Sequence, residues 1–179
     1  MALLTLASVA VSAVGIGCGA GPYGYAREYA PTRDERRLLE TSTEVTYEEL
    51  KRDPADFASV TVGWFGVVQD FEAGPEGRVT LRLTFTTLAQ RNLCDNERAS
   101  SCRVTVSHRE GGPFSAIVTL SEEERSGEDR LQRGSLVRVF GSANGDFDER
   151  GGPVLDGEWH RHWPRSTYRT TAARGRMRR

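Results

Sequence analysis

"RVTLRLTFTTL", residues 78–88, alternates apolar and polar side chains along most of its length. The apolar side chains occupy every second position: Val79, Leu81, Leu83 and Phe85. Arg82 and Thr84 lie between them. Successive side chains of a strand point to opposite faces of a sheet. The pattern therefore predicts a strand with one face in the core and the other in solvent, typical of a mainly β fold.

Further strand-like stretches lie on both sides of this segment. The stretch "SVTVGWFGVVQDF", residues 59–71, predicts a first strand with Val60, Val62 and Trp64 on one face. Gly63 and Gly66 within it suggest a bulge or a sharp bend. The remaining stretches with strand character are residues 102–108, 115–120, 135–143 and 152–164.

Two short helices are expected between these strands. Thr46 can cap a helix over residues 47–52, with Glu49 completing a capping box and Pro54 ending the helix. Ser121 followed by Glu124 is a second helix-start signal, before the last two strands.

This order predicts a small OB-like Greek-key β-barrel of five to six antiparallel strands with one or two short helices. In barrels of the OB kind a helix lies between the third and fourth strands, where the Ser121 signal falls. A β-sandwich is the alternative.

The N-terminus carries an apolar run, "MALLTLASVAVSAVGIGCGAG", without a charged side chain. This is the layout of an export signal, and the run is too short for a membrane-spanning helix. Cys18 follows Gly17 and precedes Gly19. That order resembles a bacterial lipoprotein signal, in which residues 1–17 are removed and the cysteine carries lipid such as palmitate. The alternative is a secretory signal cut elsewhere, with Cys18 incidental.

The rest of the chain divides into three expected parts. Residues 18–42 lack a sustained period and are expected to form a lipid-anchored flexible tether, followed by the barrel domain over residues 43–164. Residues 165–179 hold six arginines and no acid and are expected to form a disordered tail. The tail is expected to be solvated or to contact anionic polymers and lipid headgroups of the cell envelope.

Composition argues against nucleic acid as a partner. The chain has 24 basic and 25 acidic side chains, a formal net charge of −1. No whole-molecule field therefore attracts a polyanion.

Cys94 and Cys102 remain as a pair if Cys18 is lipidated. In an exported protein disulfides persist, so the pair is expected to form one. Metal binding is the alternative, but two thiols at this spacing without a second pair do not match the usual zinc motifs.

The segment "WHRHW", residues 159–163, can be interpreted as a metal site or as packing. On a strand, His160 and His162 share one face, while Trp159 and Trp163 share the other. A catalytic zinc needs a third protein ligand, and nothing in the sequence brings the remaining histidine, His108, near the pair. The tryptophans are therefore expected to form the packed face that closes the barrel, with the histidines on a wetter face. No metal or cofactor is expected.

Several stretches resemble the Slp-type outer-membrane lipoproteins. The stretch "VTYEELKRDPADFASVTVGWFGVVQDFE" is similar to the opening of that family, "LQRGSLVRVFGSANG" to one of its later strands, and "GGPVLDGEWHRHWP" to its closing segment. The family pattern has no counterpart of Cys94 and Cys102. The resemblance implies an outer-membrane address and a barrel fold, and it implies no catalytic residues.

No nucleophile elbow, phosphate-binding loop or dinucleotide fingerprint occurs in the sequence. The acids at 122–124, 128 and 129 are expected to be solvated rather than catalytic. The sequence thus predicts an exported, non-catalytic outer-membrane lipoprotein with a structural or interaction role. The alternative is an OB-fold module that binds an oligosaccharide, a peptide or a metal in the envelope.

Overall fold

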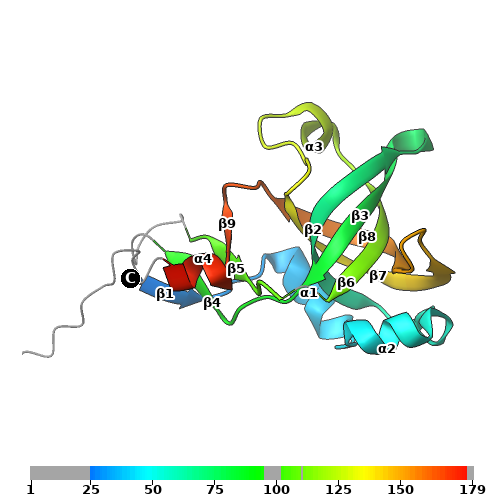
Figure 1. Ribbon diagram of the computed structural model, residues 1–179. Coiled ribbons are helices and arrows are strands. Elements are labelled where there is room, and N and C mark those ends of the chain that lie inside the picture. Colours follow the sequence, from blue (N-terminus) through cyan, green and yellow to red (C-terminus); the bar gives the residue numbers. More distant parts are fainter. Residues whose placement is uncertain (1–24, 95–101, 110, 177–179) are drawn as a thin grey trace, which may run out of the picture.

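The computed structural model describes residues 25–94, 102–109 and 111–176. Its centre is a closed barrel of five strands in the order β2-β3-β6-β8-β7 (Figure 1). These strands are β2 (Val62–Ala73), β3 (Arg78–Thr86), β6 (Gly112–Thr119), β7 (Leu136–Phe147) and β8 (Pro153–Trp163). The 3₁₀ turn η2 (Pro75–Gly77) joins β2 to β3.

The strand order confirms the expected OB-like barrel. The short helix α3 (Glu122–Ser126) falls between the third and fourth barrel strands, as OB topology requires. One detail of the prediction is wrong, because β6 and β8 pair in parallel. They are the third and fifth barrel strands and run in the same direction. The barrel closes between them, so they must pair in parallel. A closed barrel also excludes the β-sandwich alternative.

The barrel interior is filled with side chains. Val79, Leu81 and Leu83 are buried as their alternation predicted, and Phe85 is half-buried at the edge of the same core. Trp64 and Phe114 meet edge to face inside, with ring centroids 5.5 Å apart. A filled barrel leaves no central channel for a ligand, so any binding site must lie on its surface or at its ends.

The glycines of β2 do not form the expected bulge. The register shift in β2 lies between Val68 and Asp70. A Cβ atom at Gly66 would lie 2.6 Å from the ring of Phe114, and one at Gly63 would lie 2.6 Å from the ring of Phe140. Both glycines therefore make room for buried aromatic rings, a packing role that the local sequence does not reveal.

Both predicted helix starts are confirmed. Helix α2 (Tyr47–Arg52) begins at Thr46, and Glu49 completes its capping box. Helix α3 begins at Ser121 with Glu124 in the same role. Asp53 ends α2, and Pro54 opens the 3₁₀ turn η1 (Pro54–Phe57).

The segments expected to be a tether and a tail are ordered where the structure describes them, so those two predictions are wrong there. The strand β1 (Tyr25–Glu28) and the helix α1 (Arg33–Thr41) lie within the expected tether. The strand β9 (Tyr168–Thr170) and the helix α4 (Thr171–Arg176) lie within the expected tail. Their order comes from pairing with distant strands, which no local pattern encodes.

These termini build a second, smaller unit beside the barrel, which we call the side lobe (Figure 1). The strand β1 pairs with β4 (Arg91–Cys94), and β9 pairs in parallel with β5 (Val104–Val106). The side lobe consists of β1, β4, β5, β9 and α4. The stretch 102–108 thus forms a strand as predicted, but outside the barrel.

A second apolar cluster joins the side lobe to the outer face of the barrel. Val104 and Val106 of β5 are buried against Phe65, Leu136 and Trp163 of the barrel. No helix among the described residues is long and apolar enough to cross a membrane.

The backbone next to the two cysteines is paired. Leu93 and Arg103 are antiparallel partners that exchange both backbone hydrogen bonds. Cys94 follows Leu93, and Cys102 precedes Arg103. Cys102 is disulfide-bonded. The Cys94 side chain lies outside the described residues, so the Cys94–Cys102 pairing stays a prediction. Residues 1–17 and Cys18 lie outside them too.

We predict that Trp163 anchors the lobe to the barrel. Trp163 is 8% exposed and stacks on Phe65 with ring centroids 5.9 Å apart. Replacing it with Ala should lower the free energy of unfolding by about 3–5 kcal/mol, because a large buried aromatic side chain is lost. Trp159 is only half-buried, so Trp159→Ala is the matched control and should cost clearly less. Urea unfolding of both variants measures this, and equal losses would contradict the prediction.

Candidate binding site

A fully buried carboxylate lies between α1 and the outer face of the barrel. Glu35 of α1 has no exposed surface. Arg138 of β7 donates to its Oε1 at 2.7 Å, and Arg161 of β8 donates to its Oε2 at 3.2 Å. The Tyr29 hydroxyl and the Thr32 backbone N–H also donate to this carboxylate. The group is therefore paired twice and hydrogen-bonded on both oxygens, as a buried charge must be to persist.

Aromatic rings enclose the two arginines of this network. The Arg138 guanidinium lies 4.7 Å from the ring centroids of both Phe65 and Phe140, and Arg161 lies 4.6 Å from that of Trp163. Such cation–π contacts stabilise desolvated guanidinium groups. One glutamate balances one of the two arginines, which leaves a local charge of +1.

The pKa values of the network follow from this geometry. Burial alone would raise the pKa of Glu35, but hydrogen bonds from Tyr29, Arg138 and Thr32 and the charge of Arg138 hold it below its usual value. Burial, followed by the hydrogen bond to Glu35, raises the pKa of the Tyr29 hydroxyl. Glu35 is thus an anion and Tyr29 a neutral donor at neutral pH.

A cavity opens beside Arg138. Its volume is about 640 Å³, within the range of small-molecule sites. The wall comes from the chain between α1 and α2, the start of β2, the end of β3 and Arg138 itself. Its apolar and aromatic lining consists of Leu39, Val45, Tyr47, Trp64, Phe65, Phe85 and Leu88.

The aromatic side of the cavity is rigid. Trp64 donates from Nε1 to the Val45 carbonyl at 3.0 Å, and Tyr47 donates to the Pro113 carbonyl at 2.9 Å. The rings of Trp64 and Phe85 lie 5.0 Å apart, and those of Tyr47 and Phe85 lie 5.5 Å apart. The cavity therefore combines a fixed aromatic wall with Arg138, which is paired with Glu35, and with the carboxylate of Glu44. This arrangement is suited to a small aromatic ligand.

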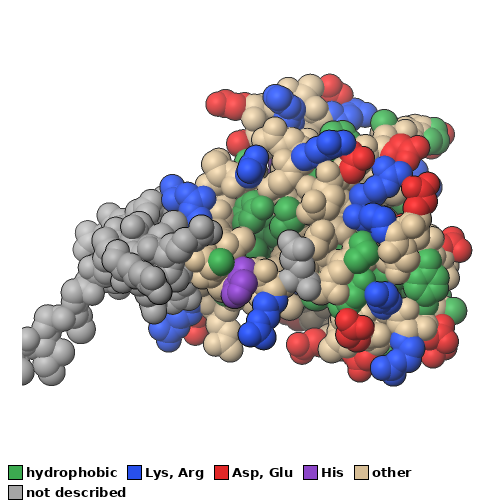
Figure 2. All heavy atoms as spheres, viewed as in Figure 1, with side chains coloured by type: hydrophobic (Ala, Val, Ile, Leu, Met, Phe, Trp, Pro, Cys, Tyr) green, Lys and Arg blue, Asp and Glu red, His purple; other side chains and the backbone are tan. Residues whose placement is uncertain are grey.

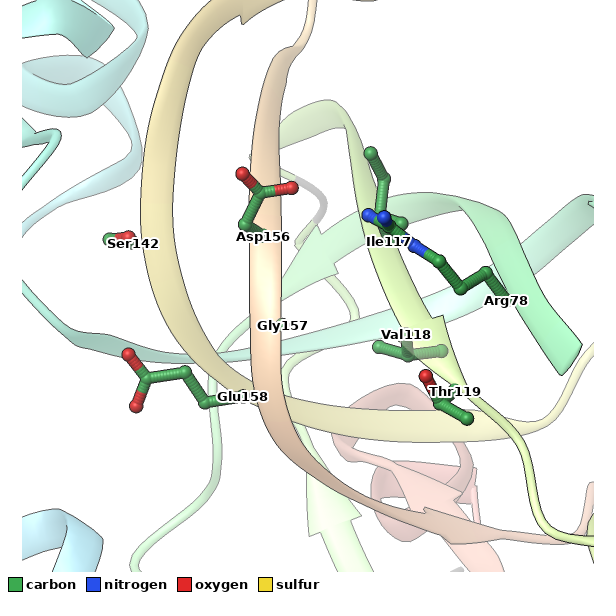
Figure 3. A pocket seen from close by; sticks show the side chains of 8 residues that line it. All are labelled: Arg78, Ile117, Val118, Thr119, Ser142, Asp156, Gly157 and Glu158. Atoms are coloured by element: carbon green, nitrogen blue, oxygen red, sulfur yellow. The ribbon is translucent and has the colours of Figure 1, made fainter. Parts of the chain in front are cut away.

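A second, smaller hollow lies where β6 and β8 diverge after three paired positions. Its volume is about 370 Å³, and side chains of β3, β6, β7 and β8 line it (Figure 3). Asp156 and Glu158 supply negative charge there and Arg78 supplies positive charge. No aromatic side chain lines it, so it offers little apolar surface for a ligand.

The face that OB barrels commonly use for oligonucleotides and oligosaccharides is formed by the second and third strands. Here these are β3 and β6, whose half-buried or exposed residues include Thr80, Arg82, Ile117 and Thr119. Arg82 pairs with Glu72 at 3.0 Å and with Asp70 at 3.7 Å. Two exposed aromatic side chains, Phe71 and Phe147, lie at the ends of β2 and β7.

The histidine pair lies on the face opposite the tryptophans, as the strand period predicted, but the expectation of a wet environment is wrong. The side chains of His160 and His162 are 10% and 12% exposed. Both contact Glu124 Oε1, at 2.8 and 3.3 Å, and His162 also contacts the Asp129 carbonyl. The reason is tertiary, because α3 folds over this end of the barrel. Among the described residues, no group of three His, Cys, Asp or Glu side chains is arranged to hold a metal.

The expectation that the tryptophans close the barrel is wrong, because Trp163 belongs to the second apolar cluster outside the barrel and not to the core inside it. Trp163 is buried, whereas Trp159 is half-buried against Phe140, at 5.8 Å between ring centroids. Arg161 between them lies over Trp163 and reaches Glu35 rather than only solvent. His108 does not belong to this face, because its Nδ1 lies 2.6 Å from the Thr171 hydroxyl in the side lobe.

The acidic run behaves largely as expected. Glu122, Glu123, Glu128 and Asp129 are exposed. Glu124 is the exception, since it caps α3 and contacts both histidines.

The sequence interpretation missed Tyr29, Glu35 and Arg138. Glu35 is one of several charges in "RDERRLLE", and nothing local distinguishes it. The sequence does contain a sign that Arg138 is buried, because it is the lone charge in the apolar strand "SLVRVF". A charge at such a position needs a buried partner.

The strand order and the position of α3 place this chain in the class of OB-like barrels. No protein-family model matches the chain, and no curated protein matches it. Among solved structures it is similar to the small single-stranded DNA-binding protein from Streptomyces coelicolor. The identity is 16%, the match covers 58% of this chain and 92% of that chain, and the TM-score is 0.34. So distant a likeness does not bear on what this chain binds.

We predict that Glu35 is required to hold α1 on the barrel. Glu35→Gln should lower the free energy of unfolding by about 3–5 kcal/mol, because it leaves Arg138 buried without its charged partner. Since the folded-state pKa of Glu35 is lowered, its contribution is present above its unfolded pKa of about 4.3 and is lost as the pH falls through the folded pKa. Urea unfolding between pH 3 and pH 7 measures both effects.

The control is Glu40→Gln, an exposed position on the same helix. It should unfold like the parent protein and keep the parent's loss of stability in acid. The Glu35 variant should lose less stability between pH 7 and pH 3 than the parent. Equal acid sensitivity of the parent and the Glu35 variant would contradict the assignment.

Proposed function

We propose that this protein is an exported outer-membrane lipoprotein, lipid-anchored through Cys18, with a non-catalytic structural or interaction role. The observation that carries the proposal is the uncharged apolar leader that ends at Cys18 between small residues. The first described strand, β1, begins seven positions later and belongs to the side lobe. An anchor at Cys18 would thus hold the lobe close to the lipid surface. Membership of the Slp-type family is part of the proposal.

A non-catalytic role fits the described side chains. The strongest polar cluster, around Glu35, is closed by two arginines and a tyrosine and leaves no carboxylate free for acid–base work. Both histidines contact Glu124, and His162 also contacts the Asp129 carbonyl.

Charge argues against nucleic acid as the ligand of the barrel. Residues 29–87 and 111–163, which contain all five barrel strands, carry 13 basic and 21 acidic side chains, a net charge of −8. Binding to a nucleic acid depends on neutralising its phosphates with basic side chains. Arg82, on the face that OB barrels commonly use, is already paired with two acids.

Metabolic labelling with a clickable palmitate analogue tests the anchor. The wild-type chain should incorporate label and fractionate with outer membranes, and Cys18→Ala should lose both properties. The control Cys94→Ala, which changes a cysteine outside the leader, should keep the label. Absence of label from the wild type, or equal label in Cys18→Ala, would contradict the proposal.

A second candidate is a binding module for a small aromatic ligand, favoured by the aromatic wall of the cavity beside Arg138. We predict that 1-naphthol, an uncharged aromatic probe, perturbs the NMR signals of residues 43–47 and the Trp64 indole N–H. Thr43 is exposed at the cavity wall, so Thr43→Trp should obstruct the cavity and abolish these shifts. Thr119→Trp, exposed on β6, should leave them unchanged. Shifts that survive Thr43→Trp would contradict binding in the cavity.

A further inference from the structure

Charge is strongly segregated between the barrel and the side lobe. The described side chains of the side lobe and its connections include one acid, Glu28, and six arginines, a net charge of +5: Arg27, Arg91, Arg103, Arg109, Arg165 and Arg169. Residues 29–87 and 111–163 carry −8, so the lobe and the barrel are two poles of opposite charge. Figure 2 shows the acidic side chains mainly over the barrel and its helices.

The segregation is a product of the fold. The basic side chains come from three stretches that are far apart in the sequence, and the pairing of β1 with β4 and of β5 with β9 brings their strands together. Contacts between β4 and β5 join these two pairs into one unit. A single solvated tail, as the sequence suggested, would not create such a pole.

The basic side chains of the lobe are available to a partner. Four arginines with described side chains are exposed: Arg27, Arg91, Arg109 and Arg165. None of the ion pairs among the described side chains involves them. The arginines that are paired, such as Arg138 and Arg161, lie outside the lobe.

The position of the lobe relative to Cys18 selects one class of partner. Seven peptide units separate Cys18 from Tyr25, so even a fully extended chain keeps the start of β1 within about 25 Å of the lipidated residue. Electrostatic attraction to an anionic surface decays over about 8 Å at physiological ionic strength. An anchor at Cys18 confines the start of β1 to within about three of these decay lengths of the surface, so the positive pole can reach the range of the attraction while the negative barrel points away.

We propose that the side lobe is a membrane-binding surface that recognises anionic lipid headgroups and orients the barrel away from the bilayer. This inference rests on the proposed lipid anchor for its biological setting, but the binding itself is independent of the lipid. It extends the expected role of the C-terminal arginines to a folded surface that includes Arg27 of β1 and Arg91 of β4.

The test uses the full chain with Cys18→Ser, so that no lipid contributes to binding. Sedimentation with vesicles of phosphatidylcholine alone, or with about 30% phosphatidylglycerol, measures the partition coefficient. Any contribution of the apolar residues 1–17 is then shared by all variants. Binding to the anionic vesicles should exceed binding to the neutral ones and should fall as salt is added.

Two variants with the same net charge separate the lobe from the molecule as a whole. The lobe variant changes four exposed arginines to Gln: Arg27, Arg91, Arg109 and Arg165. The control variant changes four exposed basic residues outside the lobe to Gln: Lys51, Arg52, Arg78 and Arg130. The lobe variant should bind anionic vesicles at least about tenfold more weakly, whereas the control should change less than about threefold, since each basic group near the surface contributes substantially.

Equal losses in the two variants, or no preference of the Cys18→Ser chain for anionic vesicles, would overturn the inference. Binding to a soluble polyanion such as polygalacturonate without any vesicle preference would also overturn it, in favour of an envelope polymer. Failure of palmitate labelling together with lobe-dependent vesicle binding would reject the anchor and keep the membrane surface.

Discussion

The architecture outside the barrel depends on one buried ion pair. Glu35 reaches from α1 to Arg138 and Arg161 on the outer faces of β7 and β8, where no water can solvate it. Two charges removed from water are costly unless each is well paired, so α1 has only one favourable position on the barrel. Tyr29, which also donates to Glu35, ties the chain just after β1 to the same point.

The position of α1 affects both candidate surfaces, the cavity beside Arg138 and the side lobe. The chain that leaves α1 passes directly to the wall of the cavity, and the guanidinium of Arg138, which pairs with Glu35 of α1, also lines the cavity. On the other side of the network, β1 pairs with β4 and so joins the side lobe. A single carboxylate thus connects the possible ligand site to the basic surface near the expected anchor.

The barrel could be predicted from the sequence because its signals are local. The alternation around Leu81 and Leu83, the capping boxes of Thr46 and Ser121, and the strand signals after α3 each act over a few residues. The strand period also placed His160 and His162 opposite Trp159 and Trp163. The wetter environment expected for the histidines is wrong, because α3 covers them and brings Glu124 to them.

The sequence by itself determined the five barrel strands, two of the helix starts and the uncharged apolar run that ends at Cys18. Only the tertiary structure decided that residues 25–41 and 168–176 form strands and helices, that Glu35 is buried and that the side lobe is positively charged. The physical reason is the range of the interactions. Side-chain periodicity and helix capping act between near neighbours in the chain, whereas strand pairing and the burial of a charge depend on residues up to about a hundred positions away, as from Glu35 to Arg138.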